Sequence, residues 1–245
     1  MNGVSLIAES DDWLVVSKPP NLQIHPKKPG GSRTLWDQLR ELLAFEIVNG
    51  GQVSIINRLD RETSGLVLVA KNARTARRFH DLMERRAFSK EYLAIVWGWP
   101  GEDEFLVDAP IIRQGEILPS HIYVKRCIHP AGAPAVTRFR VERRFQRQGE
   151  RFSLVRAFPV TGRTHQIRLH LSHAGYPIIG DKIYGPDERC YLEFIETGWT
   201  PSLASRLLLP RHALHSALLR LEQESLEWSA PLTDDLEAWL AEAKD

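Results

Sequence analysis

The stretch from Gly65 to Ala70 places the strongest constraint on the fold, because it contains no polar side chain. A strand without a polar face is buried on both sides, which requires a sheet covered by other elements. Directly after it, apolar residues recur at helical spacing between 73 and 87, with arginines on the opposite side, so we expect an amphipathic helix there. A chain of 245 residues can bury such a core without disulfide bridges.

Other segments show further strand and helix patterns. The alternation over 136–145 predicts a strand with Phe139, Val141 and Phe145 on one face, and with Arg138, Arg140, Glu142 and Arg144 on the other. Further strands are expected at 13–16, 91–99, 153–160 and 212–222. Helices are expected at 34–43, capped by Thr34 with Asp37, at 164–174 and at 233–243. Between 17 and 31, prolines and glycines indicate a long loop. Long antiparallel strands with inserted helices predict an α+β fold, and no linker of disordered composition divides the chain.

The charge balance argues against a generic polyanion binder, since the chain has 32 basic and 31 acidic residues. Positive charge is nevertheless concentrated in residues 71–90 (+5) and 138–168 (+7), while 187–245 carry −7. Guanidinium groups bind phosphates bidentately, so both basic segments suit phosphate contacts. The alternative is that they form solvated faces.

Composition also limits the class of protein. The two cysteines, Cys127 and Cys190, stand alone, which argues against a disulfide framework or a four-cysteine zinc site. The longest apolar run, Tyr92 to Trp99, is too short to span a bilayer, and the first twelve residues do not read as a secretion signal. We therefore predict a soluble cytoplasmic protein with no membrane association.

Asp60 is the most informative candidate for chemistry. It lies in the segment N-R-L-D-R-E-T-S-G (57–65), flanked by Arg58 and Arg61, at the mouth of the apolar strand. Nearby positive charge keeps a carboxylate ionised, and an ionised aspartate can serve as nucleophile or base. The alternative is a structural ion pair and turn, in which Asp60 caps backbone amides of Thr63 or Ser64.

A second candidate site begins at Gly162. A helix N-terminus beside Arg163 favours a phosphate or carboxylate. His165, His170 and His173 suggest a metal, but no carboxylate completes the set, and five residues separate the first two by about 140° around a helix. We therefore expect no metal.

Together these motifs resemble the RluA-type pseudouridine synthases. The family's first motif is H-R-L-D-x-x-T-S-G-L, and residues 57–66 read N-R-L-D-R-E-T-S-G-L, with Asn57 in place of the common histidine. Residues 90–94 match its K-x-Y-x-A strand, and GRTHQIRLHLSHAGYPIIGDKIYG, from Gly162, matches its long third motif. The opening D-W-L-V-V-S-K-P-P and the later R-H-A-L-H-S (211–216) are also similar to family segments.

The resemblance implies an isomerase that converts selected uridines of ribosomal or transfer RNA to pseudouridine on a flipped-out nucleotide, with no cofactor. It implies that Asp60 is the catalytic carboxylate, Arg168 its ion-pair partner, and Tyr92 the residue against the target base. Asn57 lies outside the carboxylate, so activity should survive with altered RNA contacts. We assign the remaining candidates to substrate binding: Arg58, which helps to fill the space left by the extruded base, Ile167 in the pocket behind it, Arg61, Lys90, Arg163 and His165.

The resemblance also sets the expected organisation. We expect residues 1–245 to form one pseudouridine-synthase-like catalytic domain, a mixed, largely antiparallel sheet with flanking helices and loops around a central cleft. It should act on RNA as a monomer, without an N-terminal S4-type RNA-binding domain. Two alternatives remain: a catalytically silent RNA-binding module on the same fold, and an aspartate-nucleophile hydrolase. The first predicts loss of Asp60, Tyr92 or Arg168, and all three are present.

Overall fold

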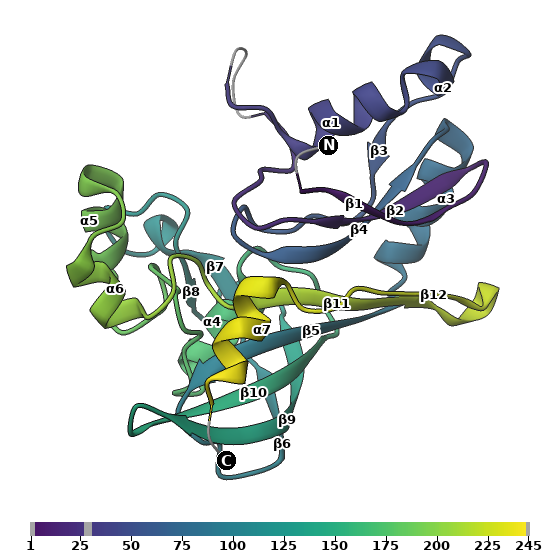
Figure 1. Ribbon diagram of the computed structural model, residues 1–245. Coiled ribbons are helices and arrows are strands. Elements are labelled where there is room, and N and C mark those ends of the chain that lie inside the picture. Colours follow the sequence, from purple (N-terminus) through teal and green to yellow (C-terminus); the bar gives the residue numbers. More distant parts are fainter. Residues whose placement is uncertain (1–2, 27–30, 244–245) are drawn as a thin grey trace. The chain divides into compact units, whose positions relative to one another are not determined.

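The computed structural model describes residues 3–26 and 31–243 (Figure 1). The chain forms two compact units, Met1–Lys90 with His215–Thr233, and Glu91–Leu214 with Asp234–Asp245. Each unit contains strands and helices, and the strand pairings are mostly antiparallel, as an α+β fold requires. Within the described residues, no helix is both long enough and apolar enough to cross a membrane.

The first unit is built on the buried strand that the sequence predicts. Its elements are β1 (Ser5–Glu9), β2 (Trp13–Lys18), α1 (Leu35–Leu42), α2 (Ala44–Val48), β3 (Ser54–Ile55), β4 (Ser64–Ala70), α3 (Ala73–Glu84), β11 (Leu214–Leu221), η2 (Glu222–Glu224) and β12 (Leu226–Ser229). The strand order is β1-β2-β4-β11, with β3 paired to β4 and β12 to β11. Among the described strands of this unit, only β4 and β11 pair in parallel.

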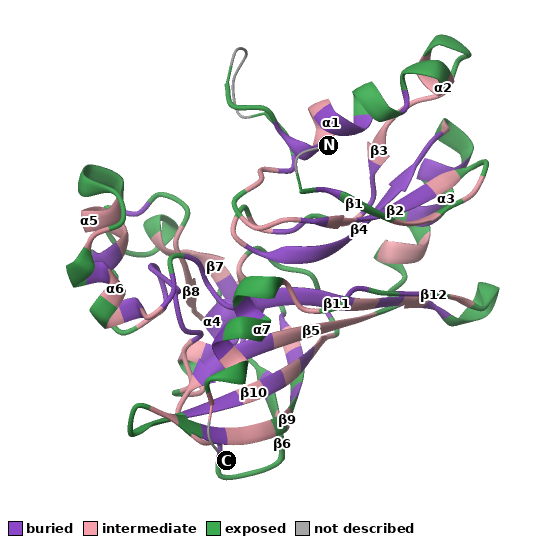
Figure 2. Ribbon diagram, viewed as in Figure 1, coloured by how far each residue is buried: buried purple, intermediate pink, exposed green. Residues whose placement is uncertain are grey.

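Strand β4 is buried at every residue, which confirms the prediction (Figure 2). Its side chains Leu66 and Leu68 belong to one core cluster with Phe79 of α3. Helix α1 begins as predicted, because the Thr34 side chain accepts the Asp37 amide and the Asp37 carboxylate accepts the Thr34 amide in a capping box.

The second unit is built on a four-stranded antiparallel sheet in the order β5-β10-β9-β6. Strand β5 spans Phe88–Trp97, and its part from Glu91 on belongs to this unit. The other elements are β6 (Glu104–Asp108), β7 (Ile111–Arg113), η1 (Gln114–Glu116), β8 (Arg126–Ile128), β9 (Val136–Arg147), β10 (Glu150–Pro159), α4 (Gln166–His173), α5 (Arg189–Thr197), α6 (Pro201–Leu207) and α7 (Asp234–Ala241). Strands β7 and β8 form a separate pair.

Strand β9 corrects one prediction, because it contains a bulge. Val141 pairs with Val155 and Arg143 pairs with the adjacent Leu154, so Glu142 is the extra residue. An extra residue exchanges the two faces of a strand from that point on. Phe145 therefore stands on the face opposite Phe139, and the predicted shared face of Phe139, Val141 and Phe145 is wrong. Arg144 is likewise separated from Arg138 and Arg140.

Helix α4 starts later than the sequence suggests. His165 has left-handed backbone geometry (φ 59°), and the helix begins at Gln166. Thr164 is therefore not its cap, which corrects the prediction of a helix from 164. Arg168 and Ile167 are buried in the first turn.

Candidate active site

The segment that carries Asp60 is fastened to β4 by a side-chain amide. The backbone amide of Ile56 donates to the carbonyl of Leu68 at 2.8 Å. Asn57 continues this pairing, since its Nδ2 donates to the Leu66 carbonyl (2.9 Å) and its Oδ1 accepts the Leu68 amide (2.8 Å). A side-chain amide offers the same donor and acceptor as a peptide group. Asn57 thus has a structural role, and its effect on RNA contacts stays a prediction.

The other end of the segment is fastened to β11. His215 Nε2 lies 3.2 Å from the Ala230 carbonyl oxygen, which requires an N–H there, so Nδ1 accepts the Ser64 hydroxyl at 2.9 Å. Gly65 pairs in parallel with Ser216 and has φ +108°. A Cβ at Gly65 would lie 2.2 Å from the Ser216 carbonyl oxygen, so only glycine fits. The serine and glycine of the motif are therefore anchors of the loop.

Asp60 lies between these anchors, in a turn closed by a hydrogen bond from the Thr63 amide to the Asp60 carbonyl (3.2 Å). The residue is half-buried, and Leu59 before it is buried. The fully buried ammonium group of Lys18 donates to the carbonyl oxygens of Pro19 (2.9 Å), Leu22 (3.0 Å) and Arg61 (3.1 Å). It thus binds the residue next to Asp60.

The proline-containing loop is held against the same segment. The exposed Arg61 donates from Nε to the Asn21 carbonyl at 3.4 Å. Burial and the positive charge of the exposed Arg58 both lower the pKa of His25. Residues 27–30 of the predicted loop lie outside the described residues.

In the second unit, Arg168 forms a buried bidentate ion pair with Asp181. Its Nε lies 2.6 Å from Oδ2 and its Nη2 2.9 Å from Oδ1, and the two side chains are 6% and 0% exposed. Burial opposes ionisation of Asp181, but Arg168 outweighs it and holds the pKa of Asp181 well below its usual range. Asp181 Oδ1 also accepts the amides of Ile183 (2.9 Å) and Tyr184 (3.0 Å). The guanidinium plane of Arg168 is therefore fixed by a carboxylate that is itself held by backbone.

The polar residues around Arg168 bind α4 to the sheet. Gln166 accepts hydrogen bonds from the Thr161 hydroxyl (2.7 Å) and the Arg163 amide (3.0 Å), and its Nε2 donates to the Thr137 hydroxyl (2.9 Å). That hydroxyl lies 2.9 Å from Nδ1 of His170, whose pKa is lowered by burial. This network gives the glutamine and second histidine of the motif structural roles. No group of residues able to hold a metal occurs within the described ranges.

Tyr92 lies on the side of this sheet that α4 covers. It pairs with Ala157, which pairs with Phe139, and directly opposed side chains share a face. Thr137 lies two residues from Phe139 and is hydrogen-bonded to α4 on that same face. The structure thus brings Tyr92, half-buried in β5, to the side of the sheet where α4 carries Ile167 and Arg168.

Comparison with known proteins decides which family has this arrangement. The family described as RNA pseudouridylate synthase matches residues 12–173. The chain belongs to the RNA pseudouridylate synthase family. It is therefore an isomerase that converts uridine to pseudouridine in RNA, as the resemblance implied.

Individual relatives agree with this assignment. The chain is 34% identical over 238 residues to ribosomal large subunit pseudouridine synthase D of Haemophilus ducreyi, covering 95% of this chain and 68% of that protein. It is 36% identical over 240 residues to ribosomal large subunit pseudouridine synthase C of Yersinia pestis, covering 94% and 66%. The solved structure of human RNA pseudouridylate synthase domain containing 4 matches with a TM-score of 0.75 at 25% identity, covering 98% of this chain and 94% of that one.

The predicted site residues of this RNA pseudouridylate synthase are divided between the two units. The first unit holds Asp60, Arg58, Arg61 and Lys90, and the second holds Tyr92, Ile167, Arg168, Arg163 and His165. Within each unit the structure brings a subset together, the 58–61 turn in one and the α4 side of the sheet in the other. The expected pairing of Arg168 with Asp60 would join the units and stays a prediction.

Three of the predicted substrate-binding residues have local contacts. Burial, together with the charge of Arg86, lowers the pKa of Lys90. Arg163 is exposed and donates from Nε to the Pro134 carbonyl at 3.2 Å. His165 Nδ1 lies 2.9 Å from the Tyr184 hydroxyl. Their roles toward RNA remain predictions.

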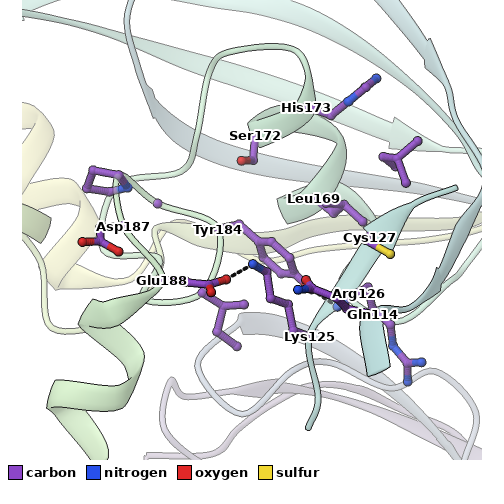
Figure 3. Close-up of a pocket in the computed structure, with 14 residues that line it drawn as sticks. Gln114, Lys125, Arg126, Cys127, Leu169, Ser172, His173, Tyr184, Asp187 and Glu188 are labelled. Atoms are coloured by element: carbon purple, nitrogen blue, oxygen red, sulfur yellow. Dashed lines mark hydrogen bonds and ion pairs between the residues drawn. The ribbon is translucent and has the colours of Figure 1, made fainter. Parts of the chain in front are cut away.

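A cavity of about 490 Å³ lies beside α4 in the second unit (Figure 3). Leu169, Ser172 and His173 of α4 line one part of it, and the ion-paired Lys125 and Glu188 line another. None of the nine predicted site residues lines this cavity. It therefore gives no support to any of the predicted roles.

Sequence reasoning did not single out Lys18 or Asp181. A signal for each was present, since Lys18 is the one charged residue of the stretch 13–18, and Asp181 lies within the third motif. In both cases the structure shows a buried charge beside a predicted catalytic residue or its neighbour. Buried charges without partners are costly, so they are informative positions.

Proposed function

We propose that this pseudouridine synthase modifies RNA of the large ribosomal subunit and that Asp60 is its catalytic carboxylate. The substrate class is supported by the names of the Haemophilus and Yersinia relatives. The role of Asp60 is supported by its place in the family motif, on a turn that Asn57 and Gly65 anchor at both ends. This anchoring is the observation that carries the proposal, because catalysis requires a carboxylate held in one geometry.

The reaction is compatible with a single carboxylate. The bond between C1′ and N1 of uridine breaks, the uracil rotates, and C5 bonds to C1′, while the C5 proton leaves and N1 gains a proton. Asp60 can attack C1′, add to C6, or remove the C2′ proton, and each route needs it ionised. The bond exchange occurs within one nucleotide, so the proposal requires neither a cofactor nor a second copy of the chain.

The second unit supplies residues suited to orienting the nucleotide and to stabilising the negative charge of the catalytic carboxylate. We propose that Arg168 stabilises the ionised Asp60 and that Asp181 is the positioning residue that fixes the plane of Arg168. Tyr92 would lie against the target base, with the buried Ile167 forming apolar surface next to it. Base flipping costs a few kcal/mol, and contacts of this kind offset that cost.

The first test is Asp60→Asn, which is nearly isosteric and removes only the negative charge. Single-turnover formation of pseudouridine should be abolished, while the urea midpoint and RNA affinity stay close to wild type. The matched control is Asp11→Asn at an exposed turn position, which should leave the rate unchanged. Retention of a substantial fraction of the rate by Asp60→Asn would refute the assignment.

The substrate is tested separately in cells. Pseudouridine positions in large-subunit ribosomal RNA and in transfer RNA should be mapped with and without the gene. We expect one or more sites in large-subunit RNA to disappear and to return with the wild-type gene but not with Asp60→Asn. Loss confined to transfer RNA would contradict the proposed substrate while leaving the catalytic role of Asp60 intact.

A further inference from the structure

Helix α3 concentrates positive charge on one exposed face. At 100° per residue, Arg74, Arg77, Arg78 and Arg85 fall within an arc of about 100° that also contains the exposed Asp81, opposite the buried Ala76 and Phe79. All four arginines are exposed. They extend over about 16 Å along the helix axis and its C-cap. With Arg86, which follows directly, they form what we call the α3 arginine surface.

Most of this surface is not neutralised. Arg78 pairs with Glu224 at 2.6 Å. For Arg74, Arg77, Arg85 and Arg86, no carboxylate of the described residues lies within ion-pair distance. By contrast, Lys71, which lies just before this helix, forms ion pairs with Glu9 and Glu46.

In the second arginine-rich segment, residues 138–168, most arginines of β9 do form ion pairs. On β9, Arg140 pairs with Glu142 at 2.8 Å, and Arg144 pairs with Asp103 at 2.7 Å. Arg147 pairs with Glu242. Sequence alone gave both segments an equal claim to phosphate contacts, and the structure separates them. The arginines of β9 are largely neutralised within the protein, and those of α3 are largely not.

The end of α3 adds an independent observation. Arg86 has left-handed geometry (φ 58°), and the Ala87 amide donates to the Leu82 carbonyl at 2.9 Å, which closes a Schellman-type helix end. Glycine usually fills this position because a side chain is disfavoured there. An arginine in its place carries a conformational cost, and its charge adds to the surface.

We propose that the α3 arginine surface binds the phosphate backbone of the substrate RNA. This inference rests on the proposed function, since it takes RNA as the partner. Arginine forks suit phosphate oxygens, and the length of the surface matches several successive phosphates of one strand. The contact is independent of sequence, so it contributes affinity and leaves the choice of uridine to other parts of the protein.

The test is the salt dependence of RNA affinity. Binding of a labelled, single-stranded RNA that contains uridine is measured in the Asp60→Asn background, so that no reaction occurs. Each phosphate contact on a single strand contributes about −0.7 to the slope of log K against log salt. The variant Arg74→Gln/Arg77→Gln/Arg85→Gln should therefore bind with a slope shallower by about 2.

The control has the same change of net charge at arginines that already have acidic partners: Arg113→Gln/Arg140→Gln/Arg206→Gln. Its slope should stay near that of the parent. An unchanged slope and Kd in the α3 variant, or an equal flattening in the control, would overturn the proposal. Failure of the catalytic assignment can be told apart from failure of this proposal. The first would appear as product formation by Asp60→Asn, and the second as unchanged salt slopes.

A single substitution at the helix end gives a second measurement. Arg86→Gly should raise the urea midpoint, because glycine favours left-handed geometry, and should weaken RNA binding, because a charge is lost. A purely structural role of Arg86 predicts unchanged RNA affinity. Greater stability with unaltered affinity would therefore remove Arg86 from the proposed surface.

Discussion

Replacing Asp181 by asparagine tests how far the fold depends on the orientation of Arg168. The substitution keeps the size of the side chain and an oxygen that can still accept the amides of Ile183 and Tyr184. It removes the negative charge and places an NH₂ group against the Nε–H of Arg168. In the wild type, Oδ2 of Asp181 accepts that hydrogen bond at 2.6 Å. Two donors would then face each other beside an uncompensated buried cation.

The burial of the pair sets the magnitude. Removing one member of a buried ion pair costs about 3–5 kcal/mol, because the other charge stays buried without compensation. The 6% and 0% exposure of Arg168 and Asp181 places this pair in that class. Since domains are stable by about 5–15 kcal/mol, Asp181→Asn should remove a large part of the free energy of unfolding. The matched control is Asp103→Asn, whose partner is Arg144 and whose side chain is 81% exposed, and it should cost less than about 1 kcal/mol.

Urea denaturation followed by circular dichroism measures both variants. The pH dependence has a definite sign, since the pKa of Asp181 is lowered in the folded protein. The stabilisation is present above the unfolded pKa of about 4 and is lost as pH falls toward the folded value. The difference in free energy of unfolding between wild type and Asp181→Asn should therefore stay constant above about pH 5 and become smaller in stronger acid. A loss below about 1 kcal/mol at neutral pH would refute the reasoning.

Two further predictions concern Gly65 and the ion pair of Arg168 with Asp181. Gly65→Ala should lower the free energy of unfolding by more than about 2 kcal/mol, because its Cβ would collide with the Ser216 carbonyl, whereas Gly101→Ala, with open space around it, should be near neutral in the same urea experiment. The double variant Arg168→Met/Asp181→Leu replaces both charges, so it should be more stable than Asp181→Asn. Its single-turnover rate should fall, and the acid limb of its rate–pH curve should move to higher pH, because a carboxylate that loses a nearby cation ionises less readily. An unmoved acid limb would show that Arg168 does not act on the catalytic carboxylate.

Features set by local sequence were predictable. The apolar run of β4, the capping box of α1 and the two-sided pattern of α3 each depend on residues a few positions apart. The family motifs pointed to Asp60, Tyr92 and Arg168 for the same reason, since each lies within a short recognisable string. Family membership confirms the activity that these strings implied.

Features set by distant partners were not predictable. The bulge at Glu142 depends on the register with β10, so the strand pattern alone assigned Phe145 to the wrong face. The ion pair of Arg168 depends on Asp181, thirteen residues along the chain and beyond the end of α4. Periodicity indicates which side of a helix or strand is apolar, but it does not indicate which charged residues form ion pairs.

The close approach of Gly65 to Ser216 also affects how the chain must fold during synthesis. The first unit combines residues up to Lys90 with residues from His215 on, and the whole of 91–214 is made between them. Until His215 and Ser216 have left the ribosome, the Ser64–Gly65 end of β4 lacks its parallel partner. The Asp60 loop then has its contacts with Asn57 and Lys18 but not its anchor on β11. Contacts so far apart in sequence form late. The nascent chain should therefore fix the Asp60 loop only after residues 215 and 216 have been synthesised.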